Sequence, residues 1–267
     1  MEAKRIVLVT GATSGIGHAI ADLLAVSGWK VYGTSRAPSN GAARWTPLTL
    51  DVTDDTSVAR AVEEVLSRSG RLDAVVNNAG TTLVGALEET SPAEALRLLD
   101  TNLIGVHRVT RAALPALRES RGRVVVIGSI AGFLPKPFEG FYAASKHALE
   151  AWTETLRFET ERFGISVSLV EPGFVRTGLA ARASEAAARL PEYAAARPAA
   201  ASRLIEDVQR GAPPAAVARC VRRILRSPAP RLRYRVGRQA HLLRLLRNVL
   251  PDSLFAAGLR RRFGSAA

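Results

Sequence analysis

Short apolar runs alternate with segments of helical periodicity along most of this chain. The apolar runs are RIVLVT, WKVYGTS, WTPLTLD, LDAVVNNAG, GRVVVIGS and ISVSLVEPG. Between them lie segments with apolar residues at helical spacing, such as HAIADLLAVSG, SVARAVEEVLSRSG and AEALRLLDTNLIGVHRVTRAALPALRES. Strands joined through helices pair in parallel, and near-continuous apolar strands are covered on both faces. The pattern predicts an α/β fold with a doubly wound parallel sheet and helices on both faces.

The C-terminal third of the chain departs from this alternation after Thr177. Its first part, GLAARASEAAARLPEYAAARPAAASRL, is rich in alanine, which predicts helix interrupted at Pro191 and Pro198. A long segment of this kind often forms a lid. PPAAVARCVRRILRS then predicts another helix and RLRYRVG a last strand. With no linker or tandem repeat, we expect one domain over residues 1–267, with a core at 1–177 and a lid, last strand and basic helices at 178–267.

The segment HLLRLLRNVL near the C-terminus has the pattern of an amphipathic helix. Arg244 and Arg247 are expected on one face, and the apolar stripe on the other consists of Leu242, Leu245, Leu246, Val249 and Leu250. This stripe favours a helix that docks on the core or contacts a second copy of the chain. A helix lying on a membrane surface is the alternative.

The formal net charge of +13 is confined to one end of the chain. Residues 1–175 carry 18 Lys and Arg against 19 Asp and Glu, whereas residues 176–267 carry 19 against 5. An excess so localised indicates a solvated basic surface, and we expect no nucleic-acid partner. Weak contact with anionic lipid, or an acidic partner, is the alternative.

The single cysteine, Cys220, excludes an internal disulfide and a multi-cysteine metal site, and we expect no metal. At the N-terminus, Lys4 and Arg5 precede an apolar run that ends at Gly11, which is too short for a signal peptide. No apolar run approaches membrane-spanning length. We therefore expect a cytoplasmic protein without a transmembrane segment.

The stretch TGATSGIG places Gly11, Gly15 and Gly17 between the first predicted strand and the first predicted helix. Small residues let the backbone approach a phosphate, and the helix N-terminus offers free N–H groups and a positive dipole end. An ordinary glycine-rich turn is the alternative. In this strand–turn–helix context the motif indicates a dinucleotide site and a single Rossmann-type sheet.

The residues after the second predicted strand indicate which dinucleotide binds. An acidic residue about twenty positions after the turn normally accepts the ribose 2′-hydroxyl of NAD, whereas an arginine accommodates the 2′-phosphate of NADP. No acidic residue occurs between Asp22 and Asp51, and Ser35 and Arg36 stand where it would be. The guanidinium fork suits a phosphate, so we expect NADP(H) in preference to NAD(H). A solvated surface arginine is the alternative.

Tyr142 and Lys146 stand one helical turn apart in FYAASKHALEAW, with only small residues between them. They project from one helical face that has room for a ligand. Shifting a phenol from a pKa of about 10 by roughly three units needs about 4 kcal/mol. One charge about 4 Å away supplies that amount at an effective dielectric constant of about 20. Ser129, at the end of GRVVVIGS, is placed to donate a hydrogen bond to a substrate oxygen while Tyr142 transfers the proton.

Together with NNAG at residues 77–80, Asn102 in LLDTNLIG and PGFVRT at residues 172–177, these motifs resemble the classical short-chain dehydrogenase/reductase family. The resemblance covers residues 5–177, with every hallmark in order and at family-like spacing. Three shorter stretches resemble reductases related to 17β-hydroxysteroid and retinol dehydrogenases, namely KVYGTSR, FYAASKHALEAWTETLR and VEPGFVRT.

The resemblance implies a catalytic role for four residues. Tyr142 would be the general acid/base, and Lys146 would lower its pKa and hold the nicotinamide ribose. Ser129 would orient the substrate carbonyl, and Asn102 would anchor a water-linked proton relay.

The resemblance also implies a set of cofactor-binding residues. Asp51 would contact the adenine, Asn78, Ala79 and Gly80 would flank the adenosine, and Thr177 would hold the carboxamide. The full set comprises Gly11, Thr13, Ser14, Gly15, Ile16, Gly17, Ser35, Arg36, Asp51, Val52, Asn78, Ala79, Gly80, Tyr142, Lys146, Pro172, Gly173, Val175 and Thr177.

We therefore expect an NADP(H)-dependent oxidoreductase that interconverts a carbonyl and a secondary or primary alcohol. Apolar residues after Ser129, in IAGFLPKPFEGF, and after Thr177 favour a lipophilic substrate of steroid, retinoid or fatty type. An NADPH-binding sensor or scaffold that acts through the basic C-terminal third is the alternative, although intact Ser129, Tyr142 and Lys146 argue against it. The resemblance implies homodimers or homotetramers, formed through helices at residues 101–119 and 142–163.

Overall fold

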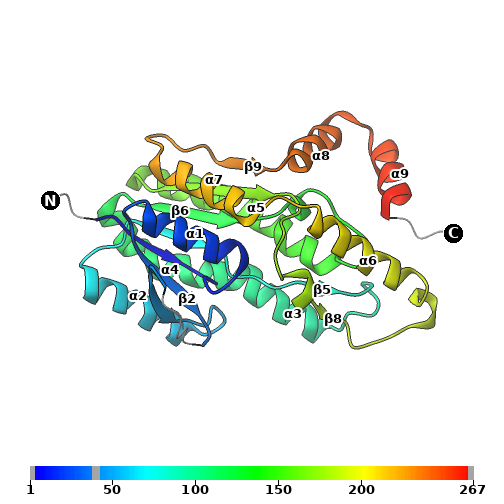
Figure 1. Ribbon diagram of the computed structural model, residues 1–267, viewed down its shortest axis with the longest axis horizontal. Coiled ribbons are helices and arrows are strands. Elements are labelled where there is room, and N and C mark those ends of the chain that lie inside the picture. The colour runs from blue at the N-terminus through cyan, green and yellow to red at the C-terminus, as the bar shows by residue number, and fades with distance from the viewer. Residues whose placement is uncertain (1–3, 38–42, 264–267) are drawn as a thin grey trace.

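A parallel sheet organises the computed structural model of this chain, which describes residues 4–37 and 43–263. Within that part of the chain the sheet has seven strands in the order β3-β2-β1-β4-β6-β7-β9 (Figure 1). Their bounds are β1 (Ile6–Val9), β2 (Lys30–Ser35), β3 (Thr46–Thr49), β4 (Ala74–Asn77), β6 (Arg123–Ile127), β7 (Ser166–Pro172) and β9 (Arg233–Val236). The order reverses between β1 and β4, so the predicted doubly wound, Rossmann-type sheet is confirmed.

Helices cover both faces of the sheet, as the apolar pattern of the strands requires. On one face α1 (Gly15–Val26) packs beside α7 (Pro214–Arg226), where Ile20, Leu24 and Val221 meet Val7 and Val9 of β1. The other face carries α2 (Asp55–Ser69), α4 (Gly105–Ser120) and α5 (Gly140–Thr160). Cys220 of α7 lies in the first of these cores, and burial raises the pKa of its thiol to about 11. Successive strand residues therefore bury alternate faces, which fixes the register of the sheet.

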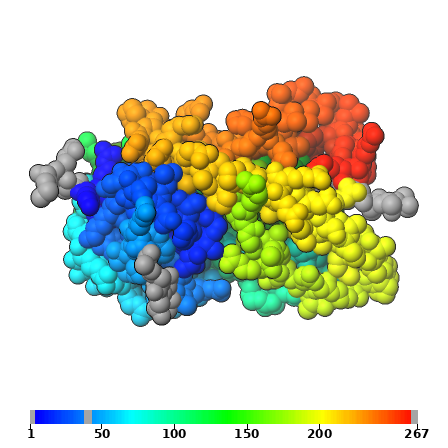
Figure 2. Space-filling view, viewed as in Figure 1, coloured from blue at the N-terminus to red at the C-terminus, as the bar shows by residue number. Residues whose placement is uncertain are grey.

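Residues 178–195, which we call the strap, form an extended segment with single 3-10 turns (Ala180–Arg182 and Pro191–Tyr193) rather than the expected interrupted helix. In the strap β8 (Ser184–Glu185) pairs with β5 (Leu83–Val84), and α6 (Ala196–Gln209) begins only afterwards. Figure 2 shows this segment on the front of the molecule, between the N-terminal part and α6. The helix prediction for residues 178–195 was wrong. Alanine favours a helix, but backbone N–H groups of the strap donate instead to carboxylates on another segment of the chain.

Those hydrogen bonds hold the strap at two points. The Ala187 N–H donates to Glu94 Oε1 at 2.9 Å, on α3 (Pro92–Leu99), and the Leu190 N–H donates to Glu89 Oε1 at 3.0 Å. Glu89 has no exposed side-chain surface and also pairs with Arg197 of α6. The Arg197 guanidinium is the main cause of the lowered pKa of Glu89, so the carboxylate stays charged and the anchor stays in place.

Strand β9 ties the C-terminal third to the helix that carries Tyr142 and Lys146. Arg233 on β9 donates to Glu150 Oε2 and to Glu154 Oε2 of α5, each at 2.9 Å. Arg235, the next arginine on β9, lies 3.4 Å from Glu171 on β7, whose carboxyl is fully buried. Burial raises the pKa of Glu171. Charged contacts on two sides therefore fix β9 against β7 and α5.

The last two helices, α8 (Arg238–Val249) and α9 (Asp252–Phe263), pack over the segment that follows β6. Ala240, Leu243 and Leu246 of α8, and Leu250 directly after it, face this core together with Phe133 and Phe255. The expected stripe was therefore only partly right: Leu246 and Leu250 face inward, whereas Leu242, Leu245 and Val249 are 56%, 59% and 69% exposed.

Contacts with aromatic residues explain which face of α8 is buried. Arg244, which was expected on the polar face, lies over the ring of Phe133 at 5.1 Å and so takes part in the contact. Spacing alone cannot distinguish two neighbouring apolar arcs of one helix. Within residues 4–37 and 43–263, no helix has both the length and the apolar content needed to cross a membrane.

Candidate active site

The glycine-rich turn is closed by contacts that leave no room for side chains. A Cβ on Gly17 would lie 2.1 Å from the carbonyl oxygen of Gly11, and a Cβ on Gly11 would lie 3.0 Å from Ala79 Cα. Gly11 and Gly15 also have positive φ values of 66° and 54°. Ser14 precedes α1 but does not cap it with its side chain, and no acidic residue stands in the first turn. This cradle, with unclaimed N–H groups at a positive helix end, fits the diphosphate of a dinucleotide.

A threonine that the sequence analysis missed ties the turn to β4. Thr10 Oγ1 accepts hydrogen bonds from the Asn78 N–H at 2.9 Å and the Ala79 N–H at 3.0 Å. The Asn78 side-chain amide in turn donates to the carbonyls of Thr10 and Gly11. Asn78 therefore holds the turn in place, and its expected contact with the adenosine stays a prediction. Only the position of Thr10 before Gly11 could have indicated its role.

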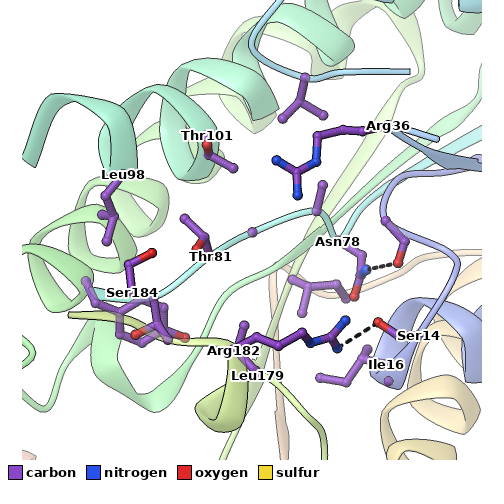
Figure 3. A pocket seen from close by; sticks show the side chains of 18 of the residues that line it. Ser14, Ile16, Arg36, Asn78, Thr81, Leu98, Thr101, Leu179, Arg182 and Ser184 are labelled. Atoms are coloured by element: carbon purple, nitrogen blue, oxygen red, sulfur yellow. Dashed lines mark hydrogen bonds between the residues drawn. The ribbon is translucent and has the colours of Figure 1, made fainter. Parts of the chain in front are cut away.

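A cleft of about 620 Å³ at the carboxyl edge of the sheet collects most of the predicted residues (Figure 3). Those that line it are Gly11, Thr13, Ser14, Gly15, Ile16, Ser35, Arg36, Asp51, Val52, Asn78, Ala79, Gly80, Tyr142, Lys146 and Thr177. Those that lie outside its lining are Gly17, Asn102, Ser129, Pro172, Gly173 and Val175. The structure thus brings residues from the ends of β1, β2, β3, β4 and β7 to one cleft.

One end of the cleft carries an arginine beside a carboxylate. Arg36 is exposed and points into the cleft in Figure 3. Asp51 Oδ1 accepts from the N–H and the hydroxyl of Thr53, and this backbone bond is the main cause of the lowered pKa of Asp51. The nearby Arg36 charge lowers that pKa further, while the Ser35 hydroxyl donates to the Ala37 carbonyl. This end therefore offers an anion-binding guanidinium and a fixed hydrogen-bond acceptor.

The other end of the cleft carries Tyr142 and Lys146 on α5. Lys146 is only 7% exposed, and its Nζ donates to the Ile127 carbonyl at 3.0 Å and lies 5.9 Å from the Tyr142 ring centroid. Burial lowers the pKa of Lys146 to about 8. Burial also raises the pKa of Tyr142 to about 12, against the lowering effect of a hydrogen bond with Ser129. The expected lowering of the Tyr142 pKa by Lys146 stays a prediction, since burial dominates among the protein groups.

Two of the predicted catalytic residues lie just behind the cleft. Ser129 follows β6, and its hydroxyl accepts from the Ala131 N–H at 3.1 Å in addition to its contact with Tyr142. Asn102 lies in a π-helical turn (Asp100–Ile104), a feature frequent at functional sites. Its side chain bonds to both backbone groups of Thr81 and to Ser145 Oγ, so it braces α5. The water-linked relay expected of Asn102 stays a prediction.

The remaining predicted residues support the walls of the cleft. The Gly173 N–H donates to the Val236 carbonyl at 2.9 Å, which joins the end of β7 to β9, and Val175 is buried. These contacts position Thr177, whose methyl group would lie 3.2 Å from a Cβ on Gly15. The cleft also has lining residues outside the quoted motifs, among them Thr81, Leu179, Arg182 and Ser184. Their elements meet only in the folded chain, so no sequence spacing relates them.

Comparison with known proteins gives the class of this fold and site. The family model described as short chain dehydrogenase matches residues 5–188. The chain belongs to the short-chain dehydrogenase/reductase family, and it is an oxidoreductase acting on carbonyl or alcohol groups with a nicotinamide cofactor.

Individual relatives extend over nearly the whole chain. It is 36% identical over 260 residues to a 3-ketodihydrosphingosine reductase from Bacteroides thetaiotaomicron, covering 96% of this chain and 97% of that protein. A crystal structure of a short-chain dehydrogenase from Streptomyces avermitilis superimposes with a TM-score of 0.81 at 35% identity, covering 97% and 99% of the two chains. An alcohol dehydrogenase from Thermococcus sibiricus, solved in complex with 5-hydroxy-NADP, is 26% identical and has a TM-score of 0.71; the match covers 87% of this chain and 95% of that one. A short-chain dehydrogenase/reductase from Burkholderia phymatum, solved in complex with NAD, is also 26% identical and has a TM-score of 0.79; the match covers 92% of this chain and 93% of that one.

The buried ammonium group of Lys146 makes the site sensitive to alkaline pH. Below a pH of about 8 Lys146 is charged, and the charge is lost as the pH rises through that value. A phenolate that develops on Tyr142 then loses its nearest cation, so kcat/KM for carbonyl reduction is expected to fall about tenfold per pH unit above pH 8. The pH dependence of kcat/KM at saturating cofactor checks this, and a profile flat to about pH 9.5 would contradict it.

Proposed function

We propose that this protein is an NADPH-dependent carbonyl reductase of a lipophilic substrate, with Tyr142 as the proton donor. The observation that carries the proposal is that Tyr142 and Lys146 line one end of the cleft whose other residues include the glycine-rich turn and Arg36. Arg36 would hold the 2′-phosphate of the cofactor, and the N-terminus of α1 its diphosphate. The bound dinucleotide supplies the hydride.

The protein's own groups would handle the proton. The Tyr142 hydroxyl would donate its proton to the substrate carbonyl oxygen, while the Ser129 hydroxyl donates a hydrogen bond that orients this oxygen. At the 5.9 Å between Lys146 Nζ and the Tyr142 ring, a unit charge stabilises the phenolate by about 3 kcal/mol at an effective dielectric constant of about 20. Asn102 would act through Ser145, whose hydroxyl donates to the Tyr142 carbonyl at 2.7 Å. These residues supply position and charge.

The pKa of Tyr142 defines its resting state in the proposed reduction. With a pKa of about 12, the phenol keeps at neutral pH the proton that a substrate carbonyl oxygen would accept. Lowering this pKa by five units needs about 7 kcal/mol. Lys146 supplies roughly 3 kcal/mol of that amount, so the bound cofactor and substrate would have to supply the rest.

A lipophilic substrate is supported by the relative from Bacteroides thetaiotaomicron, whose name describes reduction of the ketone of a long-chain base. The apolar run after Ser129 supplies no such support, because Ile130, Phe133 and Leu134 are buried against α8 and α9. The apolar side chains that line the cleft include Leu83, Leu98 and Leu179. We therefore propose a fatty-type 3-oxo substrate in preference to a steroid or retinoid.

Turnover of a substrate panel tests the proposed reaction. Wild-type protein is expected to oxidise NADPH with long-chain 3-oxo compounds, and kcat/KM should rise with chain length because each buried methylene contributes about 0.8 kcal/mol. Tyr142→Phe keeps the ring and removes the proton, so its kcat should fall by at least a hundredfold. Activity confined to small polar carbonyls would contradict the lipophilic substrate.

The same variant separates an enzyme from a sensor that merely binds NADPH through the same cleft. A sensor would bind NADPH in both proteins without turnover of any carbonyl. His147→Phe, an exposed neighbour one position from Lys146, serves as the matched control and should retain activity. Equal turnover in wild type and Tyr142→Phe would reject Tyr142 as the proton donor.

Arg36 is expected to decide cofactor preference. Arg36→Asp replaces the fork of donors with a charge that repels the 2′-phosphate, so NADPH should bind at least tenfold more weakly, with NADH unchanged or improved. Arg60→Asp makes the same charge change at an exposed position on α2 and serves as the control. Dissociation constants from cofactor fluorescence measure the effect. Unchanged NADPH affinity in Arg36→Asp would reject the preference.

A second candidate function, peripheral contact with anionic membranes, is favoured by the outer face of α8 and α9. Leu242, Leu245 and Val249 are exposed there, with Arg238 on the same helix and Arg261 on α9 also exposed. Exposed apolar residues flanked by arginines are typical of helices that lie in a membrane interface. Like charges on two such faces disfavour pairing with a second copy.

Vesicle sedimentation of the full chain tests this contact. Binding to phosphatidylglycerol vesicles at low salt is expected, with little binding to phosphatidylcholine and loss of binding at 1 M salt. Leu242→Glu with Leu245→Glu should abolish it, whereas Val26→Glu, 57% exposed on α1, should not. Absence of binding in wild type would reject the contact. Dimers or tetramers through α4 and α5, where Phe158 is 68% exposed, stay a separate proposal.

A further inference from the structure

Arg182, in the strap, reaches across the cleft to the glycine-rich turn. Its Nη2 donates a hydrogen bond to Ser14 Oγ at 2.9 Å, and its Nε donates to the Gly178 carbonyl at 3.2 Å. Figure 3 shows the guanidinium beside Ser14, inside the cleft and next to Ile16. We infer that Arg182 is a ligand of the cofactor diphosphate and closes the strap over it; this inference rests on the proposed dinucleotide function.

The electrostatic surroundings of Arg182 leave its positive charge available to a ligand. Within residues 4–37 and 43–263, no carboxylate lies within ion-pair distance of its guanidinium, and its side-chain bonds go to a neutral hydroxyl and a carbonyl. The two acidic residues nearby in the cleft are already engaged, since Glu185 pairs with Arg189 and Glu94 binds Ser91 and the strap backbone. The positive charge of Arg182 is thus not neutralised by these groups.

The partner that Arg182 does bind stands at the N-terminus of α1. Ser14 has the extended backbone typical of a capping residue, with φ −157° and ψ 166°, yet its side chain accepts no hydrogen bond from the first turn. Its oxygen instead accepts from Arg182. A guanidinium and a positive helix end, neither matched by an acidic side chain, therefore face the same space. A dianion such as a diphosphate satisfies both, because it can accept from the helix N–H groups and from the guanidinium fork.

Backbone hydrogen bonds hold the strap on both sides of Arg182, so the position of the Arg182 backbone is defined. The segment before it leaves the end of β7, where the Gly173 N–H bonds to β9. After it, the Ser184 N–H donates to the Thr82 carbonyl at 3.1 Å and the Ala186 N–H to the Val84 carbonyl at 2.9 Å. The buried Glu89 then anchors Leu190. The guanidinium is thereby delivered to the turn at a defined position, and little ordering entropy remains to be lost on binding.

Two arginines of this cleft are assigned to different phosphates. Arg36 lies at the end that also carries Asp51, whereas Arg182 lies at the start of α1. Loss of Arg36 should affect only the cofactor that carries a 2′-phosphate. Loss of Arg182 should affect every ligand that carries a diphosphate, irrespective of its 2′ substituent, and should leave ligands without one unchanged.

Binding of four ligands to the full chain tests this assignment. In Arg182→Ala the dissociation constants of NADPH, NADH and ADP should each rise about tenfold or more, by the same factor within error, while that of adenosine stays the same. Arg182→Lys should recover part of the loss, since it keeps the charge and loses the fork. Arg203→Ala, which removes an exposed arginine of α6 that does not line the cleft, is the control and should bind all four ligands as wild type does.

Each other result overturns the inference in a recognisable way. Unchanged affinity in Arg182→Ala, in a chain that binds NADPH, shows that Arg182 only bonds to Ser14, and the proposed function stands. Weakening for NADPH alone assigns Arg182 to the 2′-phosphate and rejects the diphosphate. Weakening that includes adenosine shows a general disturbance of the cleft. Wild-type protein that binds neither dinucleotide rejects the proposed function and this inference together.

Discussion

The close approach of Gly11 and Gly17 is the constraint on which the rest of the site depends. With a would-be Cβ only 2.1 Å from a carbonyl oxygen, the turn closes so tightly that α1 starts almost where β1 ends. The helix N–H groups then face the edge of the sheet at which β2, β4, β6 and β7 also end. Thr10 joins the same turn to β4 through two backbone N–H groups. The strand order then places the ends of the neighbouring strands at the same cleft, while α5 and the strap add Tyr142, Lys146 and Arg182.

Desolvation acts on both members of the tyrosine and lysine pair. It disfavours the phenolate of Tyr142 and the ammonium of Lys146, which moves the two pKa values apart, to about 12 and about 8. A ligand charge that binds beside this poorly solvated pair shifts the two pKa values more than it would shift those of an exposed pair, because a low dielectric constant strengthens the interaction. At neutral pH the protein therefore holds a neutral phenol on Tyr142 and a charged ammonium on Lys146.

Periodicity and motifs predicted the parts of the structure that local rules determine. The sheet, the turn and most of the cleft lining follow from strand-like runs and from glycines that sit between strand and helix. The strap could not be predicted in this way, because its backbone conformation depends on Glu89 and Glu94, which lie far away in sequence. The orientation of α8 likewise depends on Phe133 and Phe255. The contact between Arg182 and Ser14 was not predicted either, because it forms only when the strap has folded across the cleft.

The position of β9 in the sheet has a consequence for how the chain folds during synthesis. Strand β7 pairs with β6 on one side, but its other edge pairs only with β9, about 60 residues later. At the usual synthesis rate of about 5–20 residues per second, that edge waits roughly 3–12 s for its partner. During this time the buried carboxyl of Glu171 has no arginine from β9 beside it. An acidic side chain on an unpaired edge strand discourages pairing with other chains, so the residue that later joins the charged contacts also protects the nascent sheet from aggregation.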